Sequence, residues 1–172
     1  MTLYALGEIV PRIDPDAFVH PDSTIIGNVV IGPGATIWPQ AVLRGDQSGI
    51  VIGARTSVQD GAVIHCTREL VTTVGADCTI GHLAHLEGCT VEDRALIGTG
   101  SIVLHRAIIR TGALVGAGAV ITNDMEVPSG AMALGVPAKI RLDAVNPKQV
   151  TFPAEEYQRN WARYRAEMRR ID

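Results

Sequence analysis

The chain has 172 residues with 47% hydrophobic and only 4% aromatic side chains, which is typical of one globular domain and excludes a disordered chain. The formal net charge of −3 excludes a broad basic surface for nucleic acid, and no apolar run reaches the roughly 20 residues that a membrane span needs. Three cysteines at irregular spacing, and an N-terminus without a signal-peptide pattern, predict a soluble cytoplasmic protein.

An aliphatic residue recurs at every sixth position from Val19 to Val127, and the step slips only three times. A period of six fits neither a helix, with a period of about 3.6, nor a half-buried strand, with a period of about 2. It indicates short strands joined by turns, so that three units close one triangular coil and the coils stack about 4.8 Å apart. We therefore predict an all-β solenoid of hexapeptide repeats over residues 1–141. The alternative is a sandwich of short strands, whose turns would recur roughly every 8 to 12 residues.

The slips in the repeat locate the loops. Residues 47–51 and 67–73 are expected to leave the prism, and the short step after Leu86 is expected to tighten the corner at Gly88 and Cys89. Beyond residue 141, two prolines predict a linker over 142–153, and the remaining residues predict a helix over 154–171 within the same domain. An apolar stripe on that helix is expected to dock on the solenoid: Tyr157, Trp161, Tyr164 and Met168.

The repeat register also places polar side chains on the solenoid. His65 follows the inward-facing Ile64, and Glu87 lies one coil later at the equivalent position, so the two are expected to stack on one outer face. Arg44 is expected one rung below His65. His82 falls at a corner, with Asp60 beneath it, and cannot reach the metal of His65 within one chain.

This separation predicts a homotrimer in which His82 of one prism joins His65 and Glu87 of its neighbour. Two imidazoles and a carboxylate form a known catalytic zinc set that leaves a position for water. His85 points outward on the same face and is an alternative to Glu87 as the third ligand. The position of Glu87 directly one coil after His65 favours Glu87 as the third ligand, whereas the softer donor character of the imidazole nitrogen favours His85.

The segments LRGD (43–46), TSVQD (56–60), VIH (63–65) and IGHLAHLEGC (80–89), together with the exit GVPAKIR (135–141), resemble the γ-class carbonic anhydrase family over nearly the whole chain. The resemblance implies a left-handed parallel β-helix and a trimer with metal between its subunits. It implies that His65 and His82 are ligands, and that Arg44 and Asp46 form an ion pair between subunits. It further implies that Gln59 orients a metal-bound hydroxide and that Tyr164 approaches the site from the helix.

Two positions depart from the family pattern. Glu87 stands where the family has its third histidine ligand, and Ser57 stands where an asparagine is usual. A carboxylate ligand lowers the charge of the metal centre and makes its water a weaker acid, so we expect carbonic anhydrase activity to be weakened or lost.

The leading hypothesis is reversible hydration of CO2 to bicarbonate by hydroxide on Zn²⁺, with Fe²⁺ or Co²⁺ as the other candidate ions. A second hypothesis directs the same hydroxide at a larger electrophile such as a thioester. A third is a hexapeptide acyltransferase, which needs neither the His65 and His82 pair nor the RGD and QD elements. The fourth is a trimeric scaffold without catalytic function.

Overall fold

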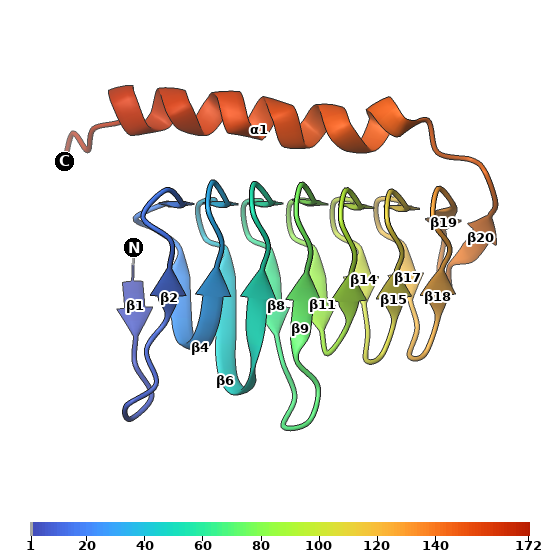
Figure 1. Cartoon of the computed structure of the whole chain (residues 1–172), viewed down its shortest axis with the longest axis horizontal. Coiled ribbons are helices and arrows are strands. Elements are labelled where there is room, and N and C mark those ends of the chain that lie inside the picture. The colour runs from blue at the N-terminus through green and yellow to red at the C-terminus, as the bar shows by residue number, and fades with distance from the viewer. Residues whose placement is uncertain (1) are drawn as a thin grey trace.

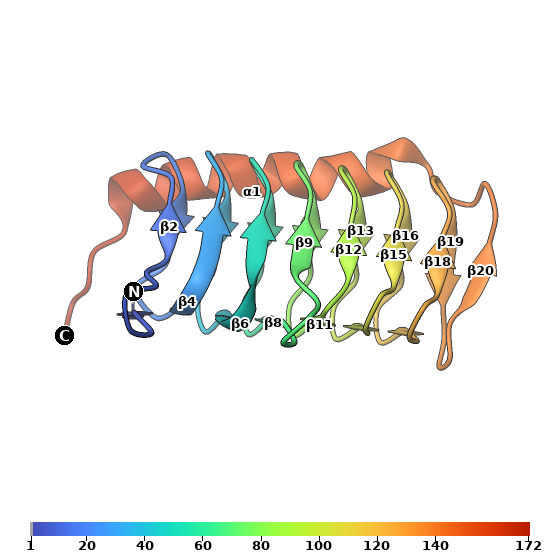
Figure 2. The same cartoon turned by 60° about the horizontal axis from the view of Figure 1, so that its bottom comes forward.

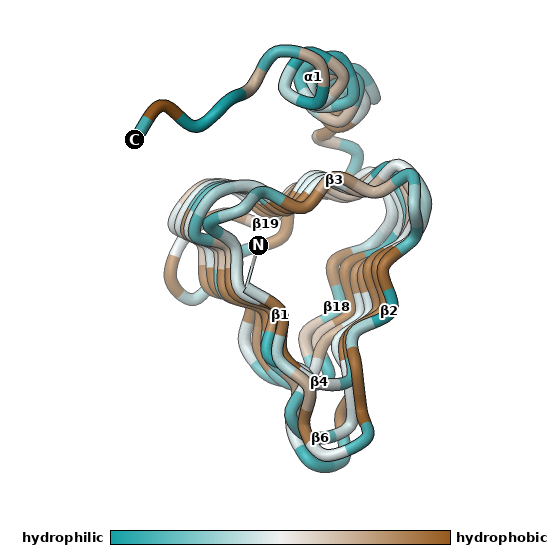
Figure 3. The backbone as a smooth tube through the Cα atoms, turned by 90° about the vertical axis from the view of Figure 1, so that its left-hand side faces the viewer, coloured by the Kyte–Doolittle hydropathy of each residue, from teal (hydrophilic) through white to brown (hydrophobic). Residues whose placement is uncertain are grey.

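The computed structural model describes residues 2–172 and shows a parallel β-solenoid of about 7 turns that matches a left-handed β-helix, with one helix along its side (Figures 1 and 2). Seen end on, the stacked coils outline a triangle, and the helix lies over one of its sides (Figure 3). The fold class predicted from the hexapeptide period is therefore confirmed.

A 12-stranded sheet covers two sides of the triangle, because β4 and β6 run around the corner between them. Its strands are β1 (Thr2–Tyr4), β2 (Arg12–Ile13), β4 (Thr24–Ile31), β6 (Val42–Ile52), β8 (Val63–His65), β9 (Thr72–Val74), β11 (His85–Glu87), β12 (Thr90–Val91), β14 (Ile102–Val103), β15 (Ile108–Ile109), β17 (Val120–Ile121) and β18 (Glu126–Val127).

An 8-stranded sheet forms the third side, which the helix α1 (Pro147–Glu167) covers. Its strands are β3 (Phe18–Val19), β5 (Thr36–Ile37), β7 (Ser57–Val58), β10 (Thr79–Ile80), β13 (Leu96–Ile97), β16 (Leu114–Val115), β19 (Met132–Leu134) and β20 (Lys139–Arg141). All pairings in this sheet are parallel except that of β19 with β20, which closes the last coil.

The interior holds one large aliphatic residue on each side of each coil, with small residues between them. Residues such as Ile64, Ile80 and Leu86 have no exposed surface, and neither do Ala62 and Ala84. Removing this aliphatic surface from water at about 25 cal/mol per Å² is the main stabilising term. The register of the repeat therefore decides which residues remain on the outside.

The helix differs from the expected range. It begins at Pro147, where Asn146 accepts a hydrogen bond from the backbone of Lys148 and Gln149 completes a capping box. Pro153 lies inside the helix instead of ending a linker, so most of the expected linker 142–153 is helical. Met168 is the C-cap residue and 42% exposed, so it does not belong to the docking stripe.

The loops agree with the slips in part. Residues 67–71 leave the coil as a turn in which the Thr67 hydroxyl accepts hydrogen bonds from the backbone of Glu69 and Leu70. Residues 47–51, in contrast, belong to β6, which pairs with β4 across a register shift between Gly27 and Val29. Among the described residues, no helix combines the length and apolar character needed to cross a membrane.

Candidate metal centre

Strands β8 and β11 bring His65 and Glu87 together. The two residues are directly paired between neighbouring coils, as are Leu86 and Ile64 on the inside. Arg44 pairs with His65 from the coil below. The stacked order of Arg44, His65 and Glu87 is the order expected from the repeat, because adding one coil preserves the side on which a residue lies.

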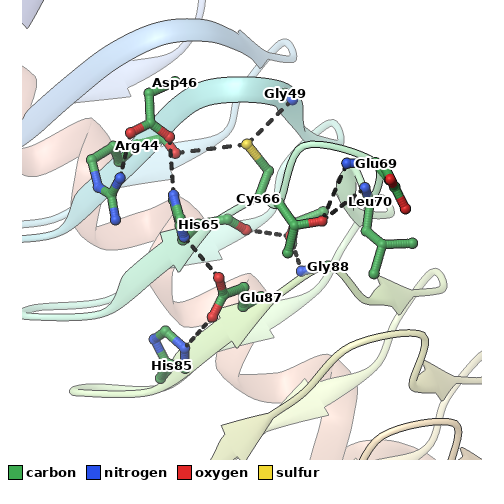
Figure 4. A network of polar contacts seen from close by, with 12 residues as sticks. Arg44, Asp46, Gly49, His65, Cys66, Glu69, Leu70, His85, Glu87 and Gly88 are labelled. Atoms are coloured by element: carbon green, nitrogen blue, oxygen red, sulfur yellow. Dashed lines mark hydrogen bonds and ion pairs between the residues drawn. The ribbon is translucent and has the colours of Figure 1, made fainter.

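The imidazole of His65 lies between two carboxylates (Figure 4). Its Nδ1 is 2.9 Å from Oε1 of Glu87, and its Nε2 is 2.9 Å from Oδ1 of Asp46. The second oxygen of Asp46 accepts a hydrogen bond from the guanidinium of Arg44. Both ring nitrogens of His65 thus face an acidic group, which sets the orientation of the ring.

The second oxygen of Glu87 faces two further imidazoles. Nε2 of His85 is 3.5 Å from Oε2, and Nε2 of His105 is 3.6 Å from the same atom. His105 was not among the residues singled out by sequence. The repeat contains the signal for it, because Val103 pairs with Leu86 and His105 lies two positions further on.

The carboxylates of this cluster are ionised at neutral pH. Burial by itself would raise the pKa of Glu87, but the hydrogen bond with His65 and the neighbouring imidazoles outweigh it and lower the pKa below its usual value. For Asp46, burial is likewise outweighed by hydrogen bonds with His65 and Arg44, and the pKa is lowered. The cluster therefore presents negative charge beside imidazole nitrogens, and carboxylate oxygen and imidazole nitrogen are both ligands of divalent cations.

His82 lies at a corner of the coil. Its Nδ1 is 3.0 Å from Oδ2 of Asp60, the carboxylate expected beneath it, and its Nε2 is 3.3 Å from the hydroxyl of Tyr157 on α1. Within residues 2–172 of one chain, no three His, Cys, Asp or Glu side chains converge as a group able to hold a metal ion. One chain by itself thus brings His65 and Glu87 together and leaves His82 apart.

The helix presents a different tyrosine from the one expected. Tyr157 contacts His82, whereas the Tyr164 ring lies 5.0 Å from Trp38 and 6.3 Å from Phe18, measured between ring centroids. Tyr164 is two helical turns further along α1, so within one chain it forms part of the docking surface. Its expected approach to the site is not seen there.

Four further residues were singled out by sequence. Gln59 is only 5% exposed. The hydroxyl of Ser57 accepts a hydrogen bond of 3.1 Å from the indole of Trp38, so this departure from the family pattern serves helix docking. Arg44 and Asp46 pair within one chain, with 45% and 27% of their side chains exposed, whereas the resemblance implies a pair between subunits.

Burial makes two of the three cysteines unsuitable as ligands. All three are unpaired and buried, and burial raises the pKa of the Cys78 and Cys89 thiols to about 12. Thiols with such values stay protonated at neutral pH, and a protonated thiol is a poor ligand and a poor nucleophile.

Comparison with known proteins gives two groups of relatives. A family model described as bacterial transferase hexapeptide (six repeats) matches residues 11–45. Gamma carbonic anhydrase 2, mitochondrial, of Arabidopsis thaliana is 38% identical over 144 residues, covering 80% of this chain and 52% of that protein. The carnitine operon protein CaiE of Escherichia coli O157:H7 is 39% identical over 104 residues, covering 60% of this chain and 53% of that protein. The chain spans about half the length of these curated relatives.

Solved structures match over the whole fold. A hexapeptide transferase family protein from Anaplasma phagocytophilum is 35% identical with a TM-score of 0.89, covering 97% of this chain and 98% of that chain. A putative acetyltransferase, the product of the BC4754 gene of Bacillus cereus, is 34% identical with a TM-score of 0.93 and the same coverage.

Proposed function

This chain belongs to the hexapeptide-repeat family and is similar to its γ-class carbonic anhydrases, and from that premise we propose that it hydrates CO2 to bicarbonate, reversibly, at a metal centre shared between the subunits of a homotrimer. The contact of 2.9 Å between Nδ1 of His65 and Oε1 of Glu87 carries the proposal. It brings a nitrogen and an oxygen donor, both suited to zinc, to one point on an outer face.

The donor set fits a metal ion in part. His65 and Glu87 supply two donors, and an imidazole such as His82 has to come from a second chain to complete the set. His85, which lies beside Glu87, is the alternative third ligand. When bound, Zn²⁺, Fe²⁺ or Co²⁺ would supply a Lewis acid that lowers the pKa of water to about 7.

The chain's own residues have defined tasks in this proposal. Asp46 accepts from Nε2 of His65 and so orients the ring, and Arg44 in turn holds Asp46. Gln59, by resemblance to the family, orients the attacking group. Because Glu87 is anionic where the family has a neutral histidine, it reduces the positive charge at the centre. We therefore expect slower CO2 hydration than a site with three histidines would give.

A second candidate is acyl transfer. It is favoured by the two full-length structural relatives described as a hexapeptide transferase family protein and a putative acetyltransferase. An acyltransferase needs one histidine as a base, but it needs neither the His65 and His82 pair nor the RGD and QD elements. Thioester hydrolysis at the metal centre and a purely structural trimer are the remaining alternatives.

Metal analysis of the purified protein tests the proposal directly. We expect about one metal ion per chain in the wild type and loss of metal in His65→Ala, with CO2 hydration lost in parallel. His20→Ala is a matched control. His20 directly follows β3 and contacts Asp22, and it contacts no residue of the candidate centre. A metal-free wild type, or a His65→Ala variant that keeps both metal and activity, would contradict the proposal.

A further inference from the structure

Thr72 is a polar residue at a core position. It is the first residue of β9 and has no exposed surface, and its neighbour on the inside is Ile50 of β6. A buried hydroxyl is costly unless both its donor and its acceptor capacity are used. The hydrogen bonds of Thr72 therefore require an explanation within this coil.

The Thr72 hydroxyl connects the two coils that carry the candidate ligands. It donates to the backbone carbonyl of His65 and accepts a hydrogen bond of 2.7 Å from the backbone N–H of Gly88, the residue after Glu87. Figure 4 labels the two residues joined in this way, His65 and Gly88. One end of the bridge is thus the main chain of His65, a candidate ligand. The other end is the main chain of Gly88, which directly follows the candidate ligand Glu87.

The bridge replaces a direct contact between coils. At the same corner of the next coil, Arg106 N–H donates to the carbonyl of Gly88 at 2.7 Å, and at a different corner Leu83 N–H donates to the carbonyl of Asp60 at 3.0 Å. Below Gly88 the chain leaves the coil at residues 67–71, so the hydroxyl of the returning strand takes the place of that contact.

The geometry at Gly88 leaves little freedom for adjustment. Its φ is +60°, a conformation that favours glycine, and a Cβ added there would lie 2.9 Å from Cβ of Leu70 in the inserted turn. The turn, the bridge and the end of β11 therefore form one packed unit directly beside Glu87.

We propose that Thr72 is a positioning residue of the metal centre: its hydroxyl holds the main chains of His65 and Gly88 at the spacing that lets His65 and Glu87 address one ion. The expected effect of Thr72 on metal binding rests on the proposed function. Its geometric part concerns the metal-free protein and stands independently.

Thr72→Val tests the proposal, since it keeps the shape and removes both hydrogen bonds. We expect faster hydrogen exchange at the Gly88 amide and altered ring-nitrogen chemical shifts of His65 in metal-free protein. We also expect Zn²⁺ binding, followed by calorimetry, to weaken by about tenfold or more, as for other residues that hold a ligand in place. Thr72→Ser retains the hydroxyl and should restore all three readouts.

Thr56→Val is the matched control. Thr56 is also fully buried, and its hydroxyl makes the same kind of bridge, donating to the carbonyl of Gly75 at 2.6 Å and accepting from the N–H of Cys78 at 3.0 Å. It should lower the melting temperature about as much as Thr72→Val while leaving the His65 shifts and Zn²⁺ affinity unchanged.

The outcomes separate the two proposals. Unchanged Gly88 exchange and His65 shifts in Thr72→Val, or an equal loss of Zn²⁺ affinity in Thr56→Val, would overturn the positioning role. A wild type that binds no Zn²⁺ would overturn the proposed function, while the metal-free readouts would still decide whether Thr72 holds the two coils.

Discussion

Glu87 is the residue on which the proposed chemistry depends most. Its two oxygens face the imidazoles of His65, His85 and His105, and its lowered pKa keeps it anionic. A histidine at this position would carry no negative charge. Glu87 and a histidine thus differ by one negative charge, and this charge lies beside the place where water loses a proton in the proposed reaction.

We predict that Glu87→His raises the rate of CO2 hydration, because a neutral ligand leaves more positive charge on the metal and favours ionisation of water. Stopped-flow assays of the metal-loaded variant and wild type measure this. An unchanged or lower rate at equal metal content would argue against charge as the limiting factor.

His85→Ala is the companion experiment. If Glu87 is the third ligand, metal content should be largely retained in His85→Ala and lost in Glu87→Ala, as measured by elemental analysis. The opposite result would make His85 the ligand and Glu87 its neighbour.

At the scale of elements, α1 reaches the candidate site through an aromatic contact. Trp38 is 4% exposed, its indole donates to Thr36 at 3.0 Å and Ser57 at 3.1 Å, and its ring lies 5.2 Å from that of Tyr157, measured between centroids. Tyr157 in turn contacts His82. The indole thus connects the helix, the solenoid and one candidate ligand.

Trp38→Ala should destabilise the protein by about 3 to 5 kcal/mol, because a large buried side chain is removed and a cavity is left. We expect amide exchange to accelerate in the part of α1 around Tyr157. Chemical denaturation and hydrogen exchange measure the two effects. A helix that stays protected would show that other contacts suffice to hold it.

A second feature at this scale is an ion-pair ladder formed by the residues that follow β12 and β15 and by the first residue of β18. Glu92 accepts from Arg110 at 2.7 Å and from the backbone N–H of Thr111 at 2.9 Å, and Arg110 also donates to Glu126 at 2.8 Å. The hydrogen bonds from Arg110 and then from Thr111 hold the pKa of Glu92 below its ordinary value of 4.5.

Because its folded-state pKa is lowered, Glu92 contributes stability above pH 4.5, and this is lost as the pH falls through the lower folded-state value. We predict that Glu92→Gln lowers the melting temperature at pH 7 and that the difference from wild type shrinks in acid. Melting curves across this range test the sign. A difference that grows in acid would contradict it.

At the scale of the whole molecule, the proposed centre needs more than one chain. His82 is held by Asp60 and Tyr157 at its own corner, away from His65 and Glu87. We predict that trimers assembled from a mixture of His65→Ala and His82→Ala chains recover metal sites that neither variant has by itself. Mixed trimers without metal would contradict a shared site.

Arg44 tests the assembly separately. In one chain 45% of its side chain is exposed beside Asp46, and a neighbouring subunit would bury the pair. Loss of one partner of a desolvated ion pair costs about 3 to 5 kcal/mol, so Arg44→Ala should give monomers or weakened trimers. Sedimentation measures this, and an intact trimer of normal thermal stability would speak against an interface there.

The sequence by itself determined the coil, its core and the stacking of Arg44, His65 and Glu87. This was possible because the six-residue period links each sequence position to one place in the cross-section of the solenoid. Apart from the inserted loops, the residue stacked on a given residue in the next coil therefore follows it at a fixed distance along the sequence. The contact of His82 with Asp60 follows from the same rule.

Tertiary structure alone decided what departs from the period. The helix begins at Pro147 because Asn146 and Gln149 cap it, and Tyr157 faces His82 because of how α1 docks on Trp38. The bridge through Thr72 exists because an inserted turn interrupts the coil beside Glu87. Such contacts join segments with no common register, so their partners are set by packing and by the need to satisfy buried polar groups.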